Sequence, residues 1–225
     1  MANGISRRFQ PLRRAEPPFV LRMAGGADTP IGGSGPVARF HPFGDPIPMQ
    51  QPALFLDRDG VINIDHGYVV RREDFAFLDG VFALARRAVD RGYRIAVVTN
   101  QSGIARGYFS EEDFAVLSGW MSGRFAAHGA ALAGVFHCPY LAGSPQPGYD
   151  RDSFWRKPNP GMILEAQRRL GLDLGRSIFV GDQPTDMAAA RAAGIGTRAL
   201  LGGKTAADAT LTAPDHTALL PLLFG

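Results

Sequence analysis

The chain has 225 residues, of which 45% are hydrophobic and 20% charged, and its formal net charge is +3. This length allows one α/β domain with a sizeable core. No apolar run approaches the roughly 20 residues that a membrane span needs, and no apolar stretch follows Arg7 and Arg8 as it would in a secretory signal. We therefore expect a cytoplasmic protein with no membrane association.

The single cysteine, Cys138, cannot form an intrachain disulfide, and one thiol cannot build a thiolate-rich zinc site. The arginines are scattered over apparent helix faces, as in the pairs 86–87 and 168–169. This distribution is typical of a solvated surface and lacks the dense basic stripe of a nucleic-acid-binding protein. We expect a monomer or a small homo-oligomer that acts on a small molecule.

Residues 1–50 differ from the rest of the chain because they contain many Pro, Gly and Arg residues and no sustained periodicity. Such a segment cannot bury enough apolar surface to offset the entropy of ordering it. We interpret it as a mostly flexible arm that drapes over a domain formed by residues 51–225. A wrongly assigned start codon would explain the same composition.

Five short apolar runs follow from residue 52 onward. They occupy residues 53–56, 94–98, 134–137, 177–180 and 197–201. Short, continuous and apolar runs are typical of parallel strands that are buried on both faces.

Segments of helical period lie between these runs. The first covers residues 81–89, with Asp79 placed to cap its start and Gly92 just beyond its end. The second follows a capping box at residues 110–113, and two more cover residues 162–170 and 186–193. Because strands and helices alternate, the sequence predicts a doubly wound parallel α/β sheet.

Polar residues follow three of the predicted strands, at the carboxyl ends where an open α/β sheet binds its ligands. Asp57 and Asp59 come after the first strand. Asp57 can attack phosphorus as a nucleophile, and Asp59 can give a proton to the leaving oxygen and later take one from water. Calcium loops also contain an Asp-x-Asp-Gly pattern, but the twelfth position of such a loop is Tyr68 here, not Glu.

A carboxylate that attacks a phosphate needs a divalent cation to offset the repulsion between the two charges. Oxygen ligands in an incomplete protein cage favour Mg²⁺. We expect the side chains of Asp57 and Asp182 and the backbone carbonyl of Asp59 to bind it. Asp186, one helical turn beyond Asp182, is either a support for this site or a favourable charge at a helix N-terminus.

Two further residues can stabilise the transferred phosphoryl group, whose oxygens carry negative charge. Thr99 offers a hydroxyl and Lys157 an ammonium, and Pro158 restricts the backbone after that lysine. An exposed lysine usually has no role in a site. A role for Lys157 therefore depends on whether it lies near the polar residues that follow the predicted strands.

These motifs resemble those of the haloacid dehalogenase superfamily of phosphotransferases. Residues 57–63 (DRDGVIN), 99–100 (TN), Lys157 and 181–186 (GDQPTD) are similar to its four motifs, in the same order. The flanking segments 65–69, 101–107 and 156–162 are similar to the D-glycero-D-manno-heptose 1,7-bisphosphate phosphatases and the related histidinol-phosphatase group. The resemblance covers roughly residues 52–205.

The resemblance implies a Rossmann-like fold without a large cap domain. It implies Asp57 as nucleophile, Asp59 as proton donor, and Thr99 and Lys157 as phosphoryl stabilisers. It also implies a set of substrate contacts: Asp65, His66, Gly67, Tyr68, Asn100, Gln101, Ser102, Arg106 and Arg156.

One departure concerns a structural zinc loop that these phosphatases commonly carry, of the form Cys-x-His followed by Cys-x-Cys. The matching positions here are Cys138, Tyr140, Ser153 and Trp155. Because structural zinc needs four nitrogen or sulfur donors, we expect no zinc and a loop held by aromatic contacts. We expect His137 to be paired or partly exposed and not a ligand.

The residues favour a Mg²⁺-dependent phosphatase for a small sugar phosphate, with heptose bisphosphate as the first candidate. The changed zinc loop weighs against that substrate more than against the chemistry. Three alternatives remain open: another small ester such as histidinol phosphate, a 3′-phosphorylated polynucleotide whose backbone the basic arm binds, and a non-catalytic binding protein on the same fold.

Overall fold

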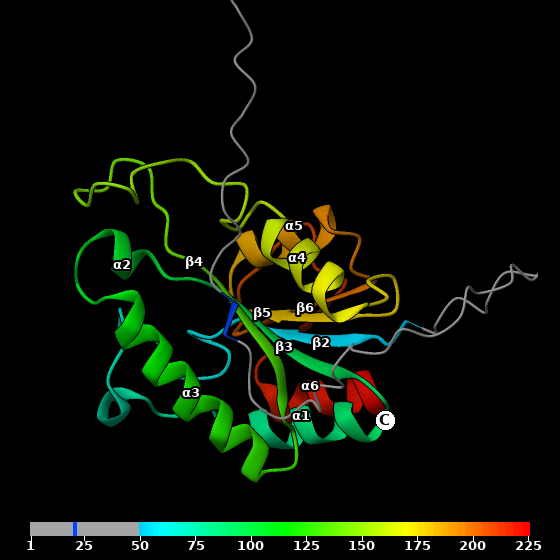
Figure 1. Cartoon of the computed structure of the whole chain (residues 1–225). Helices are drawn as coiled ribbons and strands as arrows, with labels where there is room; N and C mark the ends of the chain where they lie inside the picture. The colour runs from blue at the N-terminus through cyan, green and yellow to red at the C-terminus, as the bar shows by residue number, and fades with distance from the viewer. Residues whose placement is uncertain (1–19, 22–49) are drawn as a thin grey trace, which may run out of the picture.

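A computed structural model describes residues 20–21 and 50–225. The described chain forms a seven-stranded sheet in the order β1-β4-β3-β2-β5-β6-β7 (Figure 1). All neighbouring strands pair in parallel except β1, which pairs antiparallel with β4. The strands are β1 (Val20–Leu21), β2 (Ala53–Leu56), β3 (Arg94–Asn100), β4 (Leu132–Cys138), β5 (Ile178–Gly181), β6 (Thr197–Leu201) and β7 (Leu211–Ala213).

Helices cover both faces of the sheet, with α1, α3 and α6 on one side and α4 and α5 on the other (Figure 1). The helical segments are α1 (Val81–Asp90), α2 (Ser102–Ala105), α3 (Glu111–Ala127), α4 (Gly161–Leu170), α5 (Pro184–Ala192), α6 (His216–Phe224) and the 3₁₀ turn η1 (Arg72–Asp74). The predicted doubly wound α/β fold is therefore confirmed. None of the described helices is long and apolar enough to cross a membrane.

The central strand β2 shows why a continuous apolar run forms a strand here. Leu54 and Leu56 pack into the core on the α1 side, while Ala53 and Phe55 pack into the core on the α4 side. All four side chains are fully buried. Successive side chains of a strand point to opposite faces, so a strand buried on both faces must be apolar at every position.

The strand order reverses direction beside β2, and this reversal places the functional residues. From β2 the chain moves outward through β3 and β4, and then returns to the other side of β2 for β5, β6 and β7. Ligand crevices of open α/β sheets form at such a switch point, beyond the carboxyl ends of the two strands. Here β2 leads into Asp57 and β5 leads into Asp182, and the Asp57 amide donates to the Val180 carbonyl at 3.0 Å.

The helix boundaries confirm some of the capping predictions and correct one. Ser110 caps α3 through a capping box with Asp113, as predicted. The prediction that Asp79 caps α1 was wrong, because Gly80 occupies the N-cap with φ 82° and no side chain bonds the exposed amides. Strand β7 and helix α6 were not predicted, since α6 is apolar on nearly all sides and shows no clear helical period.

Most of the predicted arm, residues 1–50, lies outside the described residues. The two described residues before position 50 form β1, which pairs with the edge strand β4 in the register Val20↔Phe136. The domain boundary near residue 50 and the role of the arm stay predictions.

His216, at the start of α6, is a buried titratable group outside the predicted site. Its side chain is 2% exposed, and its Nε2 atom has no hydrogen-bond partner among the described residues. Burial lowers the pKa of His216 from 6.5 to about 4, although Asp215 and the Asp79 backbone act in the opposite direction. Between these two pH values the unfolded chain therefore binds a proton that the folded chain does not.

We predict that acid destabilises the fold through this histidine. The pKa of His216 is lower in the folded chain, so the stabilisation is complete above pH 6.5 and is lost as the pH falls toward 4. At pH 5 the loss in unfolding free energy is about 2 kcal/mol relative to pH 7.5. Urea unfolding at both pH values measures it. The variant His216→Gln, which cannot titrate, should lose about 2 kcal/mol less than the wild type, and an equal loss in both proteins would contradict the assignment.

Candidate active site

The predicted catalytic residues lie together in a pocket of about 140 Å³ at the switch point of the sheet. Asp57 follows β2, Thr99 lies near the end of β3, Asp182 follows β5, and Lys157 comes from the loop before α4. The pocket is lined by Asp57, Asp59, Asp65, Thr99, Asn100, Lys157, Asp182, Gln183, Thr185 and Asp186. The convergence predicted from three separate strand ends is therefore present in the fold.

Lys157 joins two carboxylates at the floor of this pocket. Its Nζ lies 2.9 Å from Asp57 Oδ1 and 2.7 Å from Asp186 Oδ1, and it donates to the Val98 carbonyl at 3.1 Å. The lysine is only 4% exposed. Burial acts to lower the pKa of Lys157, but the charges of Asp186 and Asp57 outweigh it and raise the pKa above its ordinary value. The ammonium is therefore a fixed positive charge beside Asp57.

Asp57 is also buried, and its environment controls its charge. Burial raises the pKa of Asp57 to about 7, and Asp186 adds to this effect, while Lys157 acts to lower the pKa. The Asp57 Oδ1 atom accepts a hydrogen bond from the Arg58 amide at 2.7 Å. An added positive charge in the pocket would favour the ionised form of Asp57 further, and only that form is nucleophilic.

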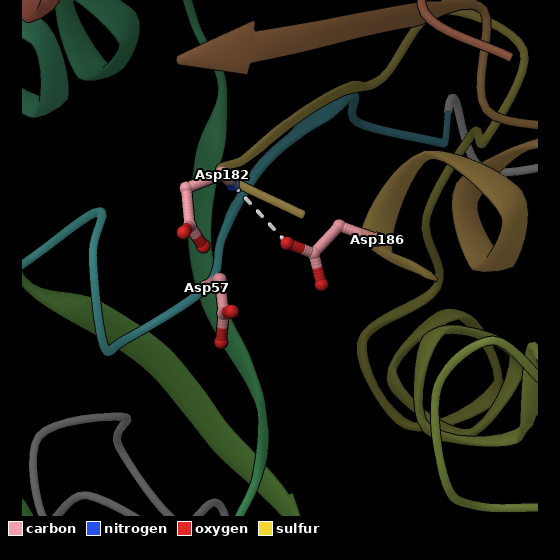
Figure 2. A group of neighbouring side chains, drawn as sticks. All are labelled: Asp57, Asp182 and Asp186. Carbon is pink, nitrogen blue, oxygen red and sulfur yellow. Dashed lines mark hydrogen bonds between the residues drawn. The ribbon is translucent and has the colours of Figure 1, made fainter. Parts of the chain in front are cut away.

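The carboxylates suit a divalent cation. One oxygen each from Asp57, Asp182 and Asp186 lie within 4.8 Å of one another, and Figure 2 shows these three side chains side by side. The Oδ1 atom of Asp182 is buried and has no hydrogen-bond partner among the described residues. A hard cation such as Mg²⁺ prefers such oxygen ligands, so the donor set fits the predicted metal.

Gly60 leaves room for this arrangement. A Cβ atom at position 60 would lie 2.8 Å from the Asp182 carboxylate, and the residue has φ 81°, which other residues rarely adopt. Any side chain at Gly60 would therefore displace Asp182. Burial raises the pKa of Asp182, while a hydrogen bond from Lys204 acts to lower it.

The structure resolves the two alternatives that the sequence left open for Asp186. Its Oδ2 accepts from the amides of Asp182 at 3.2 Å and Gln183 at 3.1 Å, the first of which Figure 2 draws, and it forms a capping box at the start of α5. Its Oδ1 lies against Lys157. Asp186 therefore both caps a helix and supports the pocket, and both of its oxygens are engaged by protein groups.

Asp59 is held by a set of donors that the sequence analysis did not predict. The Arg58 guanidinium donates to both of its oxygens, at 3.1 Å from Nε and 2.9 Å from Nη2. Asn63 and Gln101 donate to one oxygen each, at 3.1 and 3.0 Å. Arg58 is 1% exposed and also donates to the Val69 carbonyl. Its burial could not be inferred because arginine is normally exposed.

The predicted substrate contacts divide into groups. Asp65 and Asn100 line the pocket. The amide group of Asn100 forms a reciprocal pair with the backbone of Lys157, at 3.0 and 3.1 Å. Gln101 is buried and donates to Asp59 and to the Thr99 hydroxyl. Asn100 thus helps to position Lys157, and Gln101 helps to position Asp59 and Thr99. Their contact with a substrate stays a prediction.

Three other predicted contacts, His66, Gly67 and Tyr68, line a separate and larger hollow of about 390 Å³ next to the pocket. Ser102 begins α2 and Arg106 ends it, while the Arg156 guanidinium donates to the Tyr140 carbonyl at 3.3 Å. None of these residues lines the 140 Å³ pocket. Contact between these residues and a substrate stays a prediction.

The loop that contains the positions matched to the zinc pattern is held by aromatic and polar contacts. The Arg151 guanidinium lies 3.8 Å from the ring centroid of Tyr140, and the Tyr140 and Tyr149 rings are 6.1 Å apart. Tyr149 donates to Glu111 at 3.1 Å, and His137 pairs with the same carboxylate at 3.3 Å. The predicted pairing of His137 is confirmed. Burial raises the pKa of Cys138, which disfavours the thiolate form.

Besides the donors to Asp59, three further residues of the site were missed by sequence analysis. Gln183 and Thr185 line the pocket, and their place inside the motif 181–186 was a signal that could have found them. Lys204 lies 3.1 Å from Asp182 but stands 22 positions away in the chain, beyond the next strand. No local pattern marks it.

Comparison with known proteins agrees with this geometry. A family profile described as HAD-hydrolase-like matches residues 154–221. The D-glycero-alpha-D-manno-heptose-1,7-bisphosphate 7-phosphatase of Burkholderia mallei is 50% identical over 186 residues, which cover 79% of this chain and 96% of the relative. The D-glycero-beta-D-manno-heptose-1,7-bisphosphate 7-phosphatase of Vibrio cholerae is 49% identical, over 68% of this chain and 82% of the relative.

A solved structure extends the likeness to the fold. The D,D-heptose 1,7-bisphosphate phosphatase from B. bronchiseptica, complexed with magnesium and phosphate, has a TM-score of 0.65 and 28% identity, over 76% of this chain and 97% of that one. The fold, the motifs and these relatives agree. The chain therefore belongs to the heptose bisphosphate phosphatases of the haloacid dehalogenase superfamily, whose chemistry is the hydrolysis of phosphomonoesters.

Proposed function

We propose that this phosphatase hydrolyses one phosphate of D-glycero-D-manno-heptose 1,7-bisphosphate, with Mg²⁺, through a phosphorylated Asp57. The observation that carries the proposal is the convergence of Asp57, Thr99, Lys157 and Asp182 in one pocket. The names of the relatives supply the substrate. A cytoplasmic location and a place in carbohydrate metabolism belong to the same proposal.

Asp57 and Asp59 divide the reaction into two steps. Asp57 attacks phosphorus and forms an acyl phosphate while the bond to the sugar oxygen breaks. Asp59 gives its proton to that leaving oxygen, and then takes a proton from the water that hydrolyses the acyl phosphate. Arg58, Asn63 and Gln101 keep the Asp59 carboxylate in a fixed orientation for both transfers.

Charge in the pocket is balanced by fixed groups. Lys157 offsets the charge of Asp57 and can donate to the phosphoryl oxygens, as can the Thr99 hydroxyl. A Mg²⁺ ion held by Asp57, Asp182 and the backbone carbonyl of Asp59 would supply the charge that lets a carboxylate and a phosphate approach each other. Asp186 keeps Lys157 in place.

We predict that a substrate panel with Mg²⁺ identifies the preferred ester. The value of kcat/KM should be highest for heptose 1,7-bisphosphate. Both anomers belong in the panel, because relatives of nearly equal identity are named for opposite ones. Histidinol phosphate and a 3′-phosphorylated oligonucleotide test the two alternative substrates. A higher kcat/KM for either of them would replace the proposed substrate and leave the chemistry in place.

We predict that Asp57→Asn lowers kcat by more than about 10³-fold on every substrate, because the nucleophile is lost. A matched control is Asp208→Asn, which removes a carboxylate that pairs with Arg191 outside the pocket. The control should keep wild-type activity. Trapping of ³²P on the wild type but not on Asp57→Asn tests the acyl phosphate directly. Unchanged hydrolysis by Asp57→Asn would exclude the mechanism.

We predict that Asp186→Asn lowers kcat by about 10²-fold, because Lys157 loses one of its two anionic partners and shifts from its position. Asparagine keeps an acceptor for the amides at the start of α5, so the fold should remain intact. Steady-state kinetics and thermal unfolding measure the two effects separately. A variant with full activity would show that Asp57 alone positions Lys157.

We also propose that the loop 139–156 keeps its structure without a bound zinc ion. Metal analysis of protein purified without added metal should find far less than one zinc per chain. The variant Arg151→Ala should destabilise the loop by about 1 kcal/mol through loss of the contact with Tyr140, which limited proteolysis within the loop can detect. Arg151→Lys serves as the control because it keeps the charge over the ring. Stoichiometric zinc would contradict the proposal.

A further inference from the structure

Lys204 is a cation at the mouth of the pocket that none of the predicted motifs contains. It follows β6 in a loop where Gly202 and Gly203 have φ values of 82° and 72°. A Cβ atom at either glycine would have open space around it. The Lys204 side chain is 48% exposed, and its Nζ lies 3.1 Å from Asp182 Oδ2. The lysine therefore reaches Asp182 from the solvent side, on a short loop that follows β6.

The two lysines of the site differ in how firmly they are held. Lys157 is buried and contacts two carboxylates and a carbonyl. Lys204 has Asp182 as its only hydrogen-bonding partner among the described residues. Exposed ion pairs of this kind are weak. Asp182 Oδ2 also accepts a hydrogen bond from the side-chain Nε2 of Gln183, so the carboxylate keeps a donor when Lys204 leaves.

The other oxygen of Asp182, Oδ1, has no hydrogen-bond partner among the described residues, and Asp182 belongs to the cluster that fits a divalent cation. A divalent cation on Asp182 would repel an ammonium a few ångströms away. The two cations thus compete for one carboxylate. Binding of the metal would free the Lys204 ammonium at the mouth of the pocket.

The size of the pocket indicates what the freed ammonium meets. Its volume of about 140 Å³ is smaller than the roughly 300–1,000 Å³ of sites that enclose a small-molecule ligand. A sugar bisphosphate with one phosphate against Asp57 therefore extends out of the pocket. Its second phosphate then lies toward the rim, where an exposed ammonium can pair with it.

We propose that Lys204 is an exchangeable counter-ion: it neutralises Asp182 until a divalent cation binds, and then binds the second phosphate of a sugar bisphosphate. The first half concerns only Lys204 and Asp182. The second half rests on the proposed function. The closing experiments therefore treat the two halves separately.

Calorimetry of Mg²⁺ binding to the metal-free protein tests the first half without any substrate. Lys204→Gln should bind Mg²⁺ about twofold to fivefold more tightly than the wild type, because the competing charge is gone. Lys204→Arg, which keeps the charge, should resemble the wild type. Arg191→Gln removes an exposed arginine that pairs with Asp208 outside the pocket and should have no effect. Equal or weaker Mg²⁺ binding by Lys204→Gln would overturn the counter-ion role.

Steady-state kinetics at saturating Mg²⁺ test the second half. Lys204→Gln should raise KM for heptose 1,7-bisphosphate about tenfold, through loss of a charged hydrogen bond to phosphate. It should change KM for p-nitrophenyl phosphate, which has no second phosphate, by less than about twofold. An equal rise for both esters, or no rise for either, would overturn the phosphate role.

The two experiments also separate this inference from the proposed function. If the wild type does not hydrolyse the bisphosphate, the proposed substrate and the phosphate role of Lys204 fail together. The Mg²⁺ affinities of Lys204→Gln and Lys204→Arg then still decide whether Lys204 is the counter-ion of Asp182.

Discussion

The ion pairs of Lys157 with Asp57 and Asp186 hold the site together. A buried ammonium is unfavourable unless anions surround it, and two buried carboxylates are unfavourable unless a cation separates them. Here each group offsets part of the cost of burying the others. Because Asp57 follows β2, Asp186 begins α5 and Lys157 comes from a loop, this triad also joins three distant segments. The catalytic geometry and the local fold thus depend on the same contacts.

The sequence predicted the parts of the site that follow directly from strand ends. Parallel strands end at one edge, so the polar residues after 53–56, 94–98 and 177–180 had to meet once those runs were recognised as strands. Two kinds of residue escaped prediction. Arg58 is buried although arginine is normally exposed. Its role in holding Asp59 becomes visible only in the folded structure. Lys204 is brought to the site by the folding of β6 beside β5, a contact without any local pattern.

The loop at residues 139–156 is held in the structure by several separate side-chain contacts. Zinc in a tetrahedral site contributes its folding energy as a unit, since loss of a ligand weakens the whole site. The contacts among Tyr140, Tyr149 and Arg151 are separate and individually weak. Each can therefore be changed alone, with a small effect. Their link to Glu111 connects the loop to the start of α3.

The glycines at the pocket floor limit how relatives of this chain can diversify. A Cβ at Gly60 would strike the Asp182 carboxylate, and one at Gly181 would strike Asp186. Neither position can gain a side chain without disabling the floor. By contrast, the loop glycines Gly202, Gly203 and Gly67 have open space around them, although their positive φ values still disfavour other residues. Natural variation that alters which ester is accepted should therefore accumulate in the surrounding loops, while the floor stays invariant across descendants with different substrates.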